Sequence, residues 1–431
     1  MNNIAKEPHL DIYTNRFELH HGTHVETFHQ GPQSQEAKTR YKKIVNALKN
    51  NYLDNLYSTL SEETLSGLSS SNKQLIDRLV NGITSEIGRG LLALAFLQLT
   101  IKSICPDQNV RLHKGGTRKK GTFSWVEGIS MRSIDSKYTN SFLRKNSLLK
   151  LNKHGLFMTR TLAENYPYSK LYKADIRGPV AEWGAVVDAI ETKQIPAKEA
   201  LCYMMSLLQN RSERFQELSS IACGLADNLR GKSFDEIKDI IFNFFNETGY
   251  SARAFEVSIH SFFQALSELD LLNGMDLVPL SQMRSANKKH KNIGDIELEE
   301  DDLIIISWDA KYGKPYLREE LDELRDKLIS HSEVKLAGFV SNTNLDKRRD
   351  IIEKMQEIEL ETGVEIQLLT FDELIDHELA SVNSETKDNI AHRWLKALVE
   401  TFAQKRTKIA PIDEPCENWI NDLIGILEKH S

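Results

Sequence analysis

The stretch GDIELEEDDLIIISWDAKYGKP, residues 294–315, constrains the fold more than any other part of this 431-residue chain. Its apolar run LIIISW is flanked by charged residues, because Asp295 precedes it, Asp309 follows it directly and Lys311 comes two positions later. Charge near an apolar core is costly unless it is paired or binds a metal. The stretch therefore predicts a buried strand with a cluster of charged side chains at its end.

The residues around this strand alternate between helix-like and strand-like patterns. An amphipathic helix is predicted at 252–272, strands at 294–298 and 303–312, a helix at 317–331, a strand at 334–341, a helix at 344–361 and a strand at 364–371. Strands that alternate with helices predict an α/β sheet. The nearly continuous apolarity of 303–308 favours a central strand that is covered on both faces.

The pattern divides the chain into six segments. They are a polar N-terminal arm (1–33), a helical scaffold (34–104), a basic region (105–180), a helical connector (181–250), the α/β core (251–385) and a C-terminal helical segment (386–431). The predicted class is α+β and multidomain, with a mostly helical N-terminal part. His20, His21, His24 and His29 lie in the arm, where a polar terminal segment is favoured over a metal site.

Composition places the chain among ordinary globular proteins, with 40% hydrophobic and 27% charged residues. The longest apolar run, at 90–101, is much shorter than the ~20 residues that a bilayer span needs and predicts a core helix. The N-terminus lacks the pattern of a signal peptide, so we expect a cytoplasmic protein with no membrane partner. The four cysteines show no Cys-x-x-Cys spacing, which argues against a disulfide framework or a zinc site.

The net charge of −7 conceals a strong polarisation along the chain. Residues 105–180 contain fifteen Lys and Arg against five Asp and Glu, a net charge of +10 that leaves −17 for the remainder. Such a basic block predicts a surface for a polyanion. A solvated basic face that binds nothing is the alternative.

Residues 125–166 in this block are predicted to form two short helices and a hairpin at 148–159, with Ser133 or Asp135 capping the second helix. This order resembles a winged helix, whose second helix enters the major groove of DNA. The predicted helix contacts are Arg132, Lys137, Asn140, Arg144 and Lys145, the wing contacts are Lys150, Lys153 and Arg160, and the upstream phosphate contacts are Lys114, Arg118, Lys119 and Lys120.

The charged cluster around the apolar strand predicts metal-dependent chemistry. Asp309 and Lys311 share one face of their strand, and Asp295 joins them if the hairpin pairs it near Ser307 or Asp309. Converging carboxylates stay ionised when a divalent cation lies between them, and hard oxygen ligands favour Mg²⁺ over Zn²⁺. A metal and a lysine together suit hydrolysis of a phosphodiester. A simple salt bridge from Lys311 to Asp309 or Glu297 is the alternative.

Asp295, thirteen intervening residues and Asp309-Ala310-Lys311 resemble the Asp…(Asp/Glu)-x-Lys signature of the PD-(D/E)XK nuclease superfamily, and the whole chain resembles a type II restriction endonuclease. The resemblance implies that Asp295, Asp309 and the Ala310 carbonyl bind Mg²⁺ and that Lys311 positions the attacking water. It also implies a further metal ligand on the preceding helix, at Glu256. Gly294 replaces the proline that the family often has before its first aspartate.

The activity implied by this resemblance is Mg²⁺-dependent, sequence-specific hydrolysis of double-stranded DNA to 5′-phosphate ends. It further implies a possible homodimer and a cognate DNA methyltransferase that is encoded separately. The loop before Asp295 adds Arg284, Lys288 and Lys289, which are predicted to contact phosphates unless the loop is merely solvated. Two alternatives stay open: a repair or junction-resolving nuclease of the same fold, and a non-catalytic winged-helix regulator.

Overall fold

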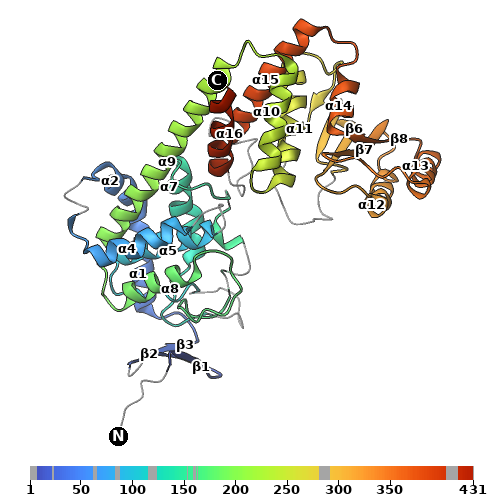
Figure 1. The fold of residues 1–431 in the computed structure, drawn as a ribbon. Helices are drawn as coiled ribbons and strands as arrows, with labels where there is room; N and C mark the ends of the chain where they lie inside the picture. Colours follow the sequence, from blue (N-terminus) through green and yellow to red (C-terminus); the bar gives the residue numbers. More distant parts are fainter. Residues whose placement is uncertain are drawn as a thin grey trace. The chain divides into compact units, whose positions relative to one another are not determined.

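The computed structural model describes residues 7–21, 24–61, 66–82, 88–114, 124–152, 154–158, 162, 164–280, 292–403 and 416–430. The chain divides into two compact units, residues 1–214 and 215–431 (Figure 1). Each unit has its own large hydrophobic core. The two units contain both helices and sheets, which confirms the predicted α+β class.

An antiparallel sheet opens the first unit, with strands β1 (His9–Ile12), β2 (Arg16–His21) and β3 (His24–His29) in the order β1-β2-β3. Phe17, Leu19 and Phe28 are buried together with Leu112 and Trp125. Apolar residues at alternate positions of β2 direct one face of the sheet to this small core. The prediction of a polar arm is therefore wrong for residues 9–29.

The helices of the first unit confirm the helical prediction for residues 34–104. They are α1 (Gln35–Lys49), α2 (Tyr52–Ser58), α4 (Ser70–Asn81) and α5 (Arg89–Ile104), followed by α8 (Val180–Glu191) and by α9 (Ala197–Asn228), which runs into the second unit. Helix α5 is buried on all sides from Leu91 to Lys102, as expected of a central core helix. Within the described parts of the chain, each helix is too short or too polar for a bilayer span.

The described residues of the basic region do not form the predicted winged helix. One helical run comprises α6 (Met131–Ile134), the π-helical η1 (Asp135–Thr139) and α7 (Asn140–Lys145), and no helix precedes it at 125–130. The short 3₁₀ helix η2 (Leu156–Met158) follows, and the described residues of 146–158 include no strand. The predicted wing is thus absent from the described part of this region.

Two buried polar side chains hold the segment after this helical run in place. An Asp135 carboxylate oxygen accepts the Leu156 N–H at 2.8 Å, and the Asn140 side chain donates to the Asn152 carbonyl at 2.9 Å. Gly155 has a φ of +89°, and a Cβ there would collide with the Asp135 carboxylate. The segment satisfies its backbone groups against the helix, so it does not need a strand partner.

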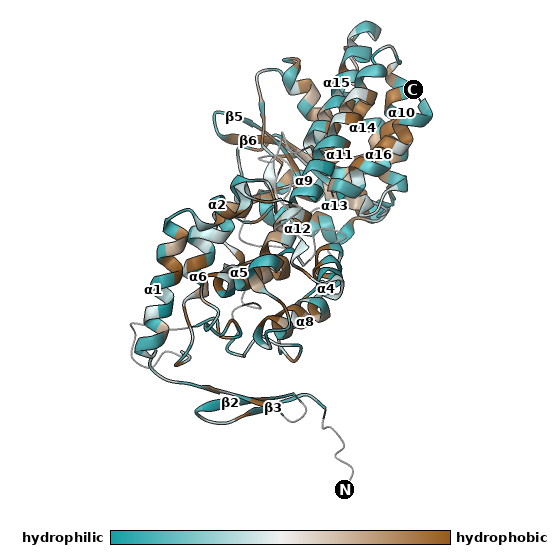
Figure 2. Cartoon of the chain, turned by 90° about the vertical axis from the view of Figure 1, so that its left-hand side faces the viewer, coloured by the Kyte–Doolittle hydropathy of each residue, from teal (hydrophilic) through white to brown (hydrophobic). Residues whose placement is uncertain are grey.

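The second unit begins with helices that cover one side of its sheet. They are α10 (Phe234–Glu247) and α11 (Ser251–Glu268), joined after the sheet by α14 (Phe371–Glu378), α15 (Ser384–Phe402) and α16 (Cys416–His430). Ser233 and Glu236 form a capping box that fixes the start of α10. The apolar faces of these amphipathic helices supply the larger core of this unit (Figure 2).

The sheet of the second unit contains β4 (Asp276–Leu277), β5 (Ile296–Glu300), β6 (Leu303–Lys311), β7 (Leu336–Ser341) and β8 (Glu365–Thr370), in that order. Strands β4, β5 and β6 are antiparallel neighbours, whereas β6, β7 and β8 are parallel. Helices α12 (Arg318–Leu328) and α13 (Arg349–Thr362) connect the parallel strands. The alternation of helices and strands and the central place of β6 are confirmed.

The two faces of this sheet have different partners. Ile296 and Trp308 pack into the core that includes α11, whereas Phe339 packs with residues of α12 and α13 such as Leu321 and Ile351. Figure 1 shows α11 on one side of the sheet and α12 and α13 on the other. Because side chains alternate along a strand, the neighbours of Trp308 in β6 point to the side of α12 and α13.

Candidate functional site

A tight hairpin brings the two ends of the charged stretch together. Asp301 and Asp302, at the turn between β5 and β6, both have positive φ values, of 51° and 63°. A two-residue turn of this kind matches the twist of paired strands and fixes their register. A register shift between Leu298 and Glu299 then moves the pairing by one residue, so that Ile296 pairs with Trp308, and the Asp295 N–H donates to the Trp308 carbonyl at 2.9 Å. This register confirms that Asp295 lies beside Asp309.

The carboxyl groups of Asp295 and Asp309 are direct neighbours. The Ala310 N–H donates to Asp295 Oδ2 at 3.1 Å, which holds the Asp295 side chain against β6. Burial raises the pKa of Asp295 to about 8, and the charge of Asp309 and a hydrogen bond between the two carboxyls contribute to the rise. Without a cation between them, the two carboxylates therefore resist simultaneous ionisation at neutral pH.

Lys311 completes the cluster on the same face. Its Nζ lies 2.9 Å from Asp309 Oδ2 and 5.6 Å from the centre of the Phe339 ring. Burial lowers the pKa of Lys311, but the charge of Asp309 and their hydrogen bond outweigh it, so the pKa is raised overall. The ammonium group thus stays charged next to the carboxyl pair. A salt bridge explains Lys311 and Asp309, but it does not explain the third ionisable group, Asp295.

The backbone just before Asp295 is held in place by a buried side chain of β5. Glu297 is buried, and one of its carboxylate oxygens accepts the N–H groups of Ile293 at 2.6 Å and Gly294 at 3.3 Å. Burial raises the pKa of Glu297. Glu297 is therefore occupied by the backbone and is not the partner of Lys311. The sequence signal for this role was an acidic residue between the two apolar residues Ile296 and Leu298 of the first strand of the hairpin.

Gly294 owes its identity to the close approach of β6. A Cβ at this position would lie 2.6 Å from both Ser307 Oγ and the Trp308 carbonyl oxygen. The hairpin has no room for a side chain there, and a proline ring would need more space still. The glycine at this position is therefore a local steric consequence of the hairpin.

Glu256 does not join the two aspartates. It lies on α11, whose apolar residues pack on the opposite side of the sheet, and it pairs with the Arg253 guanidinium on the same helix. Among the residues that the structure describes, the one set of three His, Cys, Asp or Glu side chains with ligand atoms within 4.8 Å of one another is His9, Asp11 and His20. Glu256 thus forms no compact set of three ligand atoms with Asp295 and Asp309, and its role as a further metal ligand stays a prediction.

Many of the predicted DNA contacts lie outside the described residues. These are Arg118, Lys119, Lys120, Lys153, Arg160, Arg284, Lys288 and Lys289. Among the described ones, Lys137 and Arg144 are exposed, and Lys145 is exposed with its Nζ 3.1 Å from a carboxylate oxygen of Asp54. Exposed cations on the helical run at 131–145 are compatible with phosphate contacts.

Other predicted contacts make hydrogen bonds within the first unit, among them the exposed Arg132. Asn140 is only 1% exposed and cannot read base edges, because its amide is directed to the Asn152 carbonyl. Arg132 donates to the Phe157 carbonyl at 2.6 Å, and Lys114 donates to the side chain of Asn165. Lys150 is half-buried, and its carbonyl accepts a hydrogen bond from the Arg89 guanidinium. The groove-reading role predicted for Asn140 is therefore wrong.

The histidines of the N-terminal sheet fall into different environments. His20 lies beside His9 and Asp11, whereas His24 and His29 are exposed. Burial lowers the pKa of His21. The sequence pattern had grouped His20 with its near neighbours in the chain, because the pairing of β1 with β2 is not visible in local spacing.

Comparison of the chain with known protein families and with curated protein sequences finds no match. Function therefore has to be argued from the site. The chemistry available there consists of two adjacent carboxyl groups, one of them with a raised pKa, and a charged lysine. A divalent cation would relieve the repulsion between the carboxylates.

Proposed function

We propose that this protein is a Mg²⁺-dependent nuclease whose reacting groups are Asp295, Asp309 and Lys311. The observation that carries the proposal is the contact between the two carboxyl groups, in which burial and the charge of Asp309 raise the pKa of Asp295 to about 8. A pair of carboxylates that cannot both ionise alone becomes stable when a hard dication lies between them. The donor set therefore fits Mg²⁺, with the Ala310 carbonyl as the third oxygen that the resemblance implies.

The residues of the site have separable roles. When bound, Mg²⁺ would lower the pKa of a water molecule and offset charge that develops on a phosphate. Asp309 orients the Lys311 ammonium through their 2.9 Å contact, and Lys311 holds the attacking water by a hydrogen bond. The Ala310 N–H and the hairpin register keep Asp295 in place before substrate arrives.

The substrate class that we propose is double-stranded DNA, cut at a specific sequence as by a type II restriction endonuclease of the PD-(D/E)XK superfamily. The order α11, β5, β6, α12, β7 around the carboxyl pair supports this assignment. The net charge of +10 at 105–180 supports a polyanionic substrate. We also propose 5′-phosphate products and a homodimer that cuts both strands. Recognition in this proposal does not depend on a winged helix.

The decisive experiment incubates the full chain with plasmid DNA, in Mg²⁺ and in EDTA. Asp309→Ala and Lys311→Ala should each reduce the cleavage rate by roughly 10²–10³-fold or more, the usual loss when a group that stabilises the transition state is removed. Both variants should keep their affinity for DNA when Ca²⁺ replaces Mg²⁺. Asp326→Ala and Lys335→Ala are matched controls, because both residues are exposed and lie away from the carboxyl pair.

The pattern of products separates the proposed activity from its alternatives. Discrete fragments that map to one sequence support a restriction endonuclease. Cleavage only of branched or damaged DNA would instead indicate a repair or junction-resolving enzyme. Binding without cleavage under all divalent cations would overturn the nuclease proposal and leave a non-catalytic DNA-binding regulator. Cleavage by Asp309→Ala at the rate of the wild type would show that other residues react.

A further inference from the structure

A second cluster of metal-binding side chains lies on the hairpin of β1 and β2, far from the carboxyl pair in the sequence. His9 is paired with His20 across the strands, and Asp11 is paired with Glu18. Residues two apart in a strand and directly opposite across a ladder share a face, so these four side chains project from the same face. The other face carries Phe17 and Leu19 into the small core described above.

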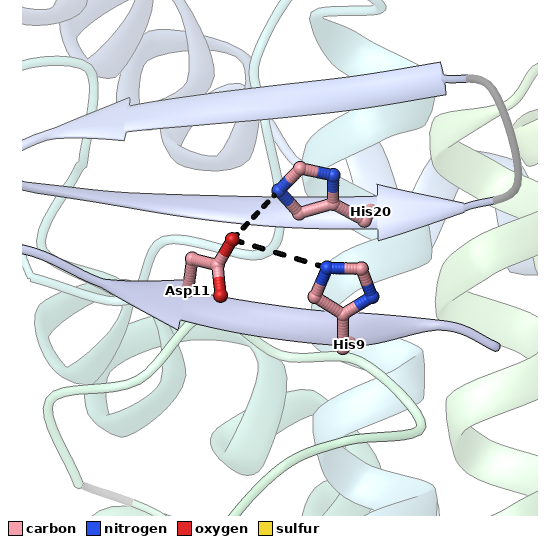
Figure 3. Close-up of side chains that lie close together, drawn as sticks. All are labelled: His9, Asp11 and His20. Atoms are coloured by element: carbon pink, nitrogen blue, oxygen red, sulfur yellow. Dashed lines mark ion pairs between the residues drawn. The ribbon is translucent and has the colours of Figure 1, made fainter. Parts of the chain in front are cut away.

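The three nearest members of this cluster converge on one point (Figure 3). Asp11 Oδ2 lies 3.2 Å from His20 Nε2 and 3.8 Å from His9 Nε2. The two imidazole rings stack with centroids 4.3 Å apart and an interplanar angle of 6°. Within the described part of the chain, His20 Nε2 is a buried atom whose 3.2 Å contact with Asp11 Oδ2 lacks the geometry of a hydrogen bond. A buried ring nitrogen without a hydrogen bond calls for an explanation, and an unplaced ion is one.

We propose that His9, Asp11 and His20 bind one divalent transition-metal ion of the Zn²⁺ class. Zn²⁺ takes imidazole nitrogen and carboxylate oxygen ligands at about 2.0–2.2 Å, so two ligands of a tetrahedral site lie about 3.3 Å apart. The 3.2 Å and 3.8 Å distances from Asp11 Oδ2 to the two imidazole nitrogens are close to this ligand–ligand distance. A metal must lie in the plane of each ring that binds it. Binding therefore turns the two stacked rings toward each other.

Glu18 adds charge to the site without being one of its three ligands. Its Oε2 lies 4.0 Å from His20 Nε2, and its other carboxylate oxygen accepts a hydrogen bond from Arg16 Nε at 2.6 Å. Because Glu18 is paired with Arg16, the carboxylate of Asp11 supplies the negative charge of the ligand set. Three protein ligands leave a fourth position for water or another small ligand, as in zinc sites with an open coordination position.

This site and the carboxyl pair of β5 and β6 differ in chemistry. Two imidazoles and one carboxylate select a borderline transition metal, whereas a site of carboxylate and carbonyl oxygens selects Mg²⁺. The ion would link β1 to β2, the one strand with which β1 pairs in the described sheet. Because binding to the folded state alone stabilises it, Zn²⁺ should slow local opening of this hairpin.

The test is a calorimetric titration of the full chain with Zn²⁺ at neutral pH, carried out in an Asp309→Asn background that removes the carboxyl pair as a competing site. We expect one Zn²⁺ per chain. His9→Gln and His20→Gln should each weaken binding by more than the roughly 10–100-fold that loss of an outer partner costs. His24→Gln is the matched control, because His24 is exposed and pairs with His21 on the other face.

Hydrogen exchange of the same proteins checks where the ion binds. Zn²⁺ should slow exchange of the β1 and β2 amides in the His24→Gln control and leave them unchanged in His9→Gln. The proposal is overturned if the chain takes up no Zn²⁺ at micromolar concentration. It is equally overturned if His9→Gln and His20→Gln bind as tightly as the control.

Discussion

The electrostatic conflict between Asp295 and Asp309 predicts an unusual dependence of stability on pH. Burial and the charge of Asp309 raise the pKa of Asp295 from 3.8 to about 8 in the folded chain. The folded state therefore holds a proton that the unfolded state releases between these two values. Stability must fall as pH rises through this window, and the contribution of Asp295 is exhausted above pH 8. Asp295→Asn removes the titration and keeps the shape of the protonated carboxyl.

The size of the effect follows from the proton difference. One pKa unit corresponds to about 1.36 kcal/mol, so two pH units within the window amount to about 2–3 kcal/mol of unfolding free energy. The wild type should lose this much more stability than Asp295→Asn between about pH 5.5 and about pH 7.5 in EDTA. Titrating groups away from the carboxyl pair are shared by the two proteins, so their contributions cancel and the difference reports the pair.

The assay is urea unfolding of the wild type and the variant, followed by tryptophan fluorescence, to which the buried Trp308, Trp394 and Trp419 of the second unit contribute. Asp326→Asn, which removes an exposed carboxylate, should follow the wild type at every pH. Mg²⁺ should restore stability to the wild type at the higher pH and not to Asp295→Asn. Equal pH slopes for the wild type and Asp295→Asn would refute the argument that the carboxyl pair is electrostatically strained.

Three further substitutions test the packing around the proposed sites. Gly294→Ala should destabilise the chain by about 1–3 kcal/mol and reduce cleavage, because a Cβ would press on β6 and displace the neighbouring aspartate; a neutral result in both assays would contradict the steric argument. Asn140→Ala should lower the unfolding free energy by about 1–3 kcal/mol while leaving any base preference of DNA binding unchanged, as selection of bound sequences would show. Arg111→Met should cost about 3–5 kcal/mol in urea unfolding, since the buried guanidinium pairs with Glu26 and Asp188; a loss below 1 kcal/mol would mean that these carboxylates are well solvated.

Local patterns in the sequence were sufficient for the central strand and its charged end. The apolar run at 303–308 and the short acidic turn specify a hairpin, and the two-residue period of a strand puts Asp309 and Lys311 on one face. Asp295 is only a hairpin away, but its approach to Asp309 also depends on the register shift between Leu298 and Glu299, which the two-residue period does not predict.

Features that depend on distant packing were not determined by these patterns. The apolar residues of the helix that carries Glu256 pack on one face of the sheet. The helical period predicts that the helix has an apolar face, but it does not predict on which face of the sheet the helix packs. The predicted wing failed for the same kind of reason, because Asp135 and Asn140 turned inward to bind backbone 21 and 12 residues away. Asp and Asn are polar residue types that are common on the exposed face of a helix. Whether such a side chain bonds to water or to the backbone of a nearby segment depends on the tertiary structure.

The N-terminal sheet has features that the local sequence pattern predicts and features that only the tertiary structure decides. The alternation of Arg16, Phe17, Glu18 and Leu19 already gives a strand with an apolar and a polar face. The convergence of His9 and His20 comes from strand register, and the burial of the apolar face comes from Leu112 and Trp125, about a hundred positions along the chain. The alternation of side chains along a strand follows from backbone geometry, so the sequence shows which residues share a face of the strand. The residues that cover this face depend on which apolar surfaces are buried together when the whole unit folds.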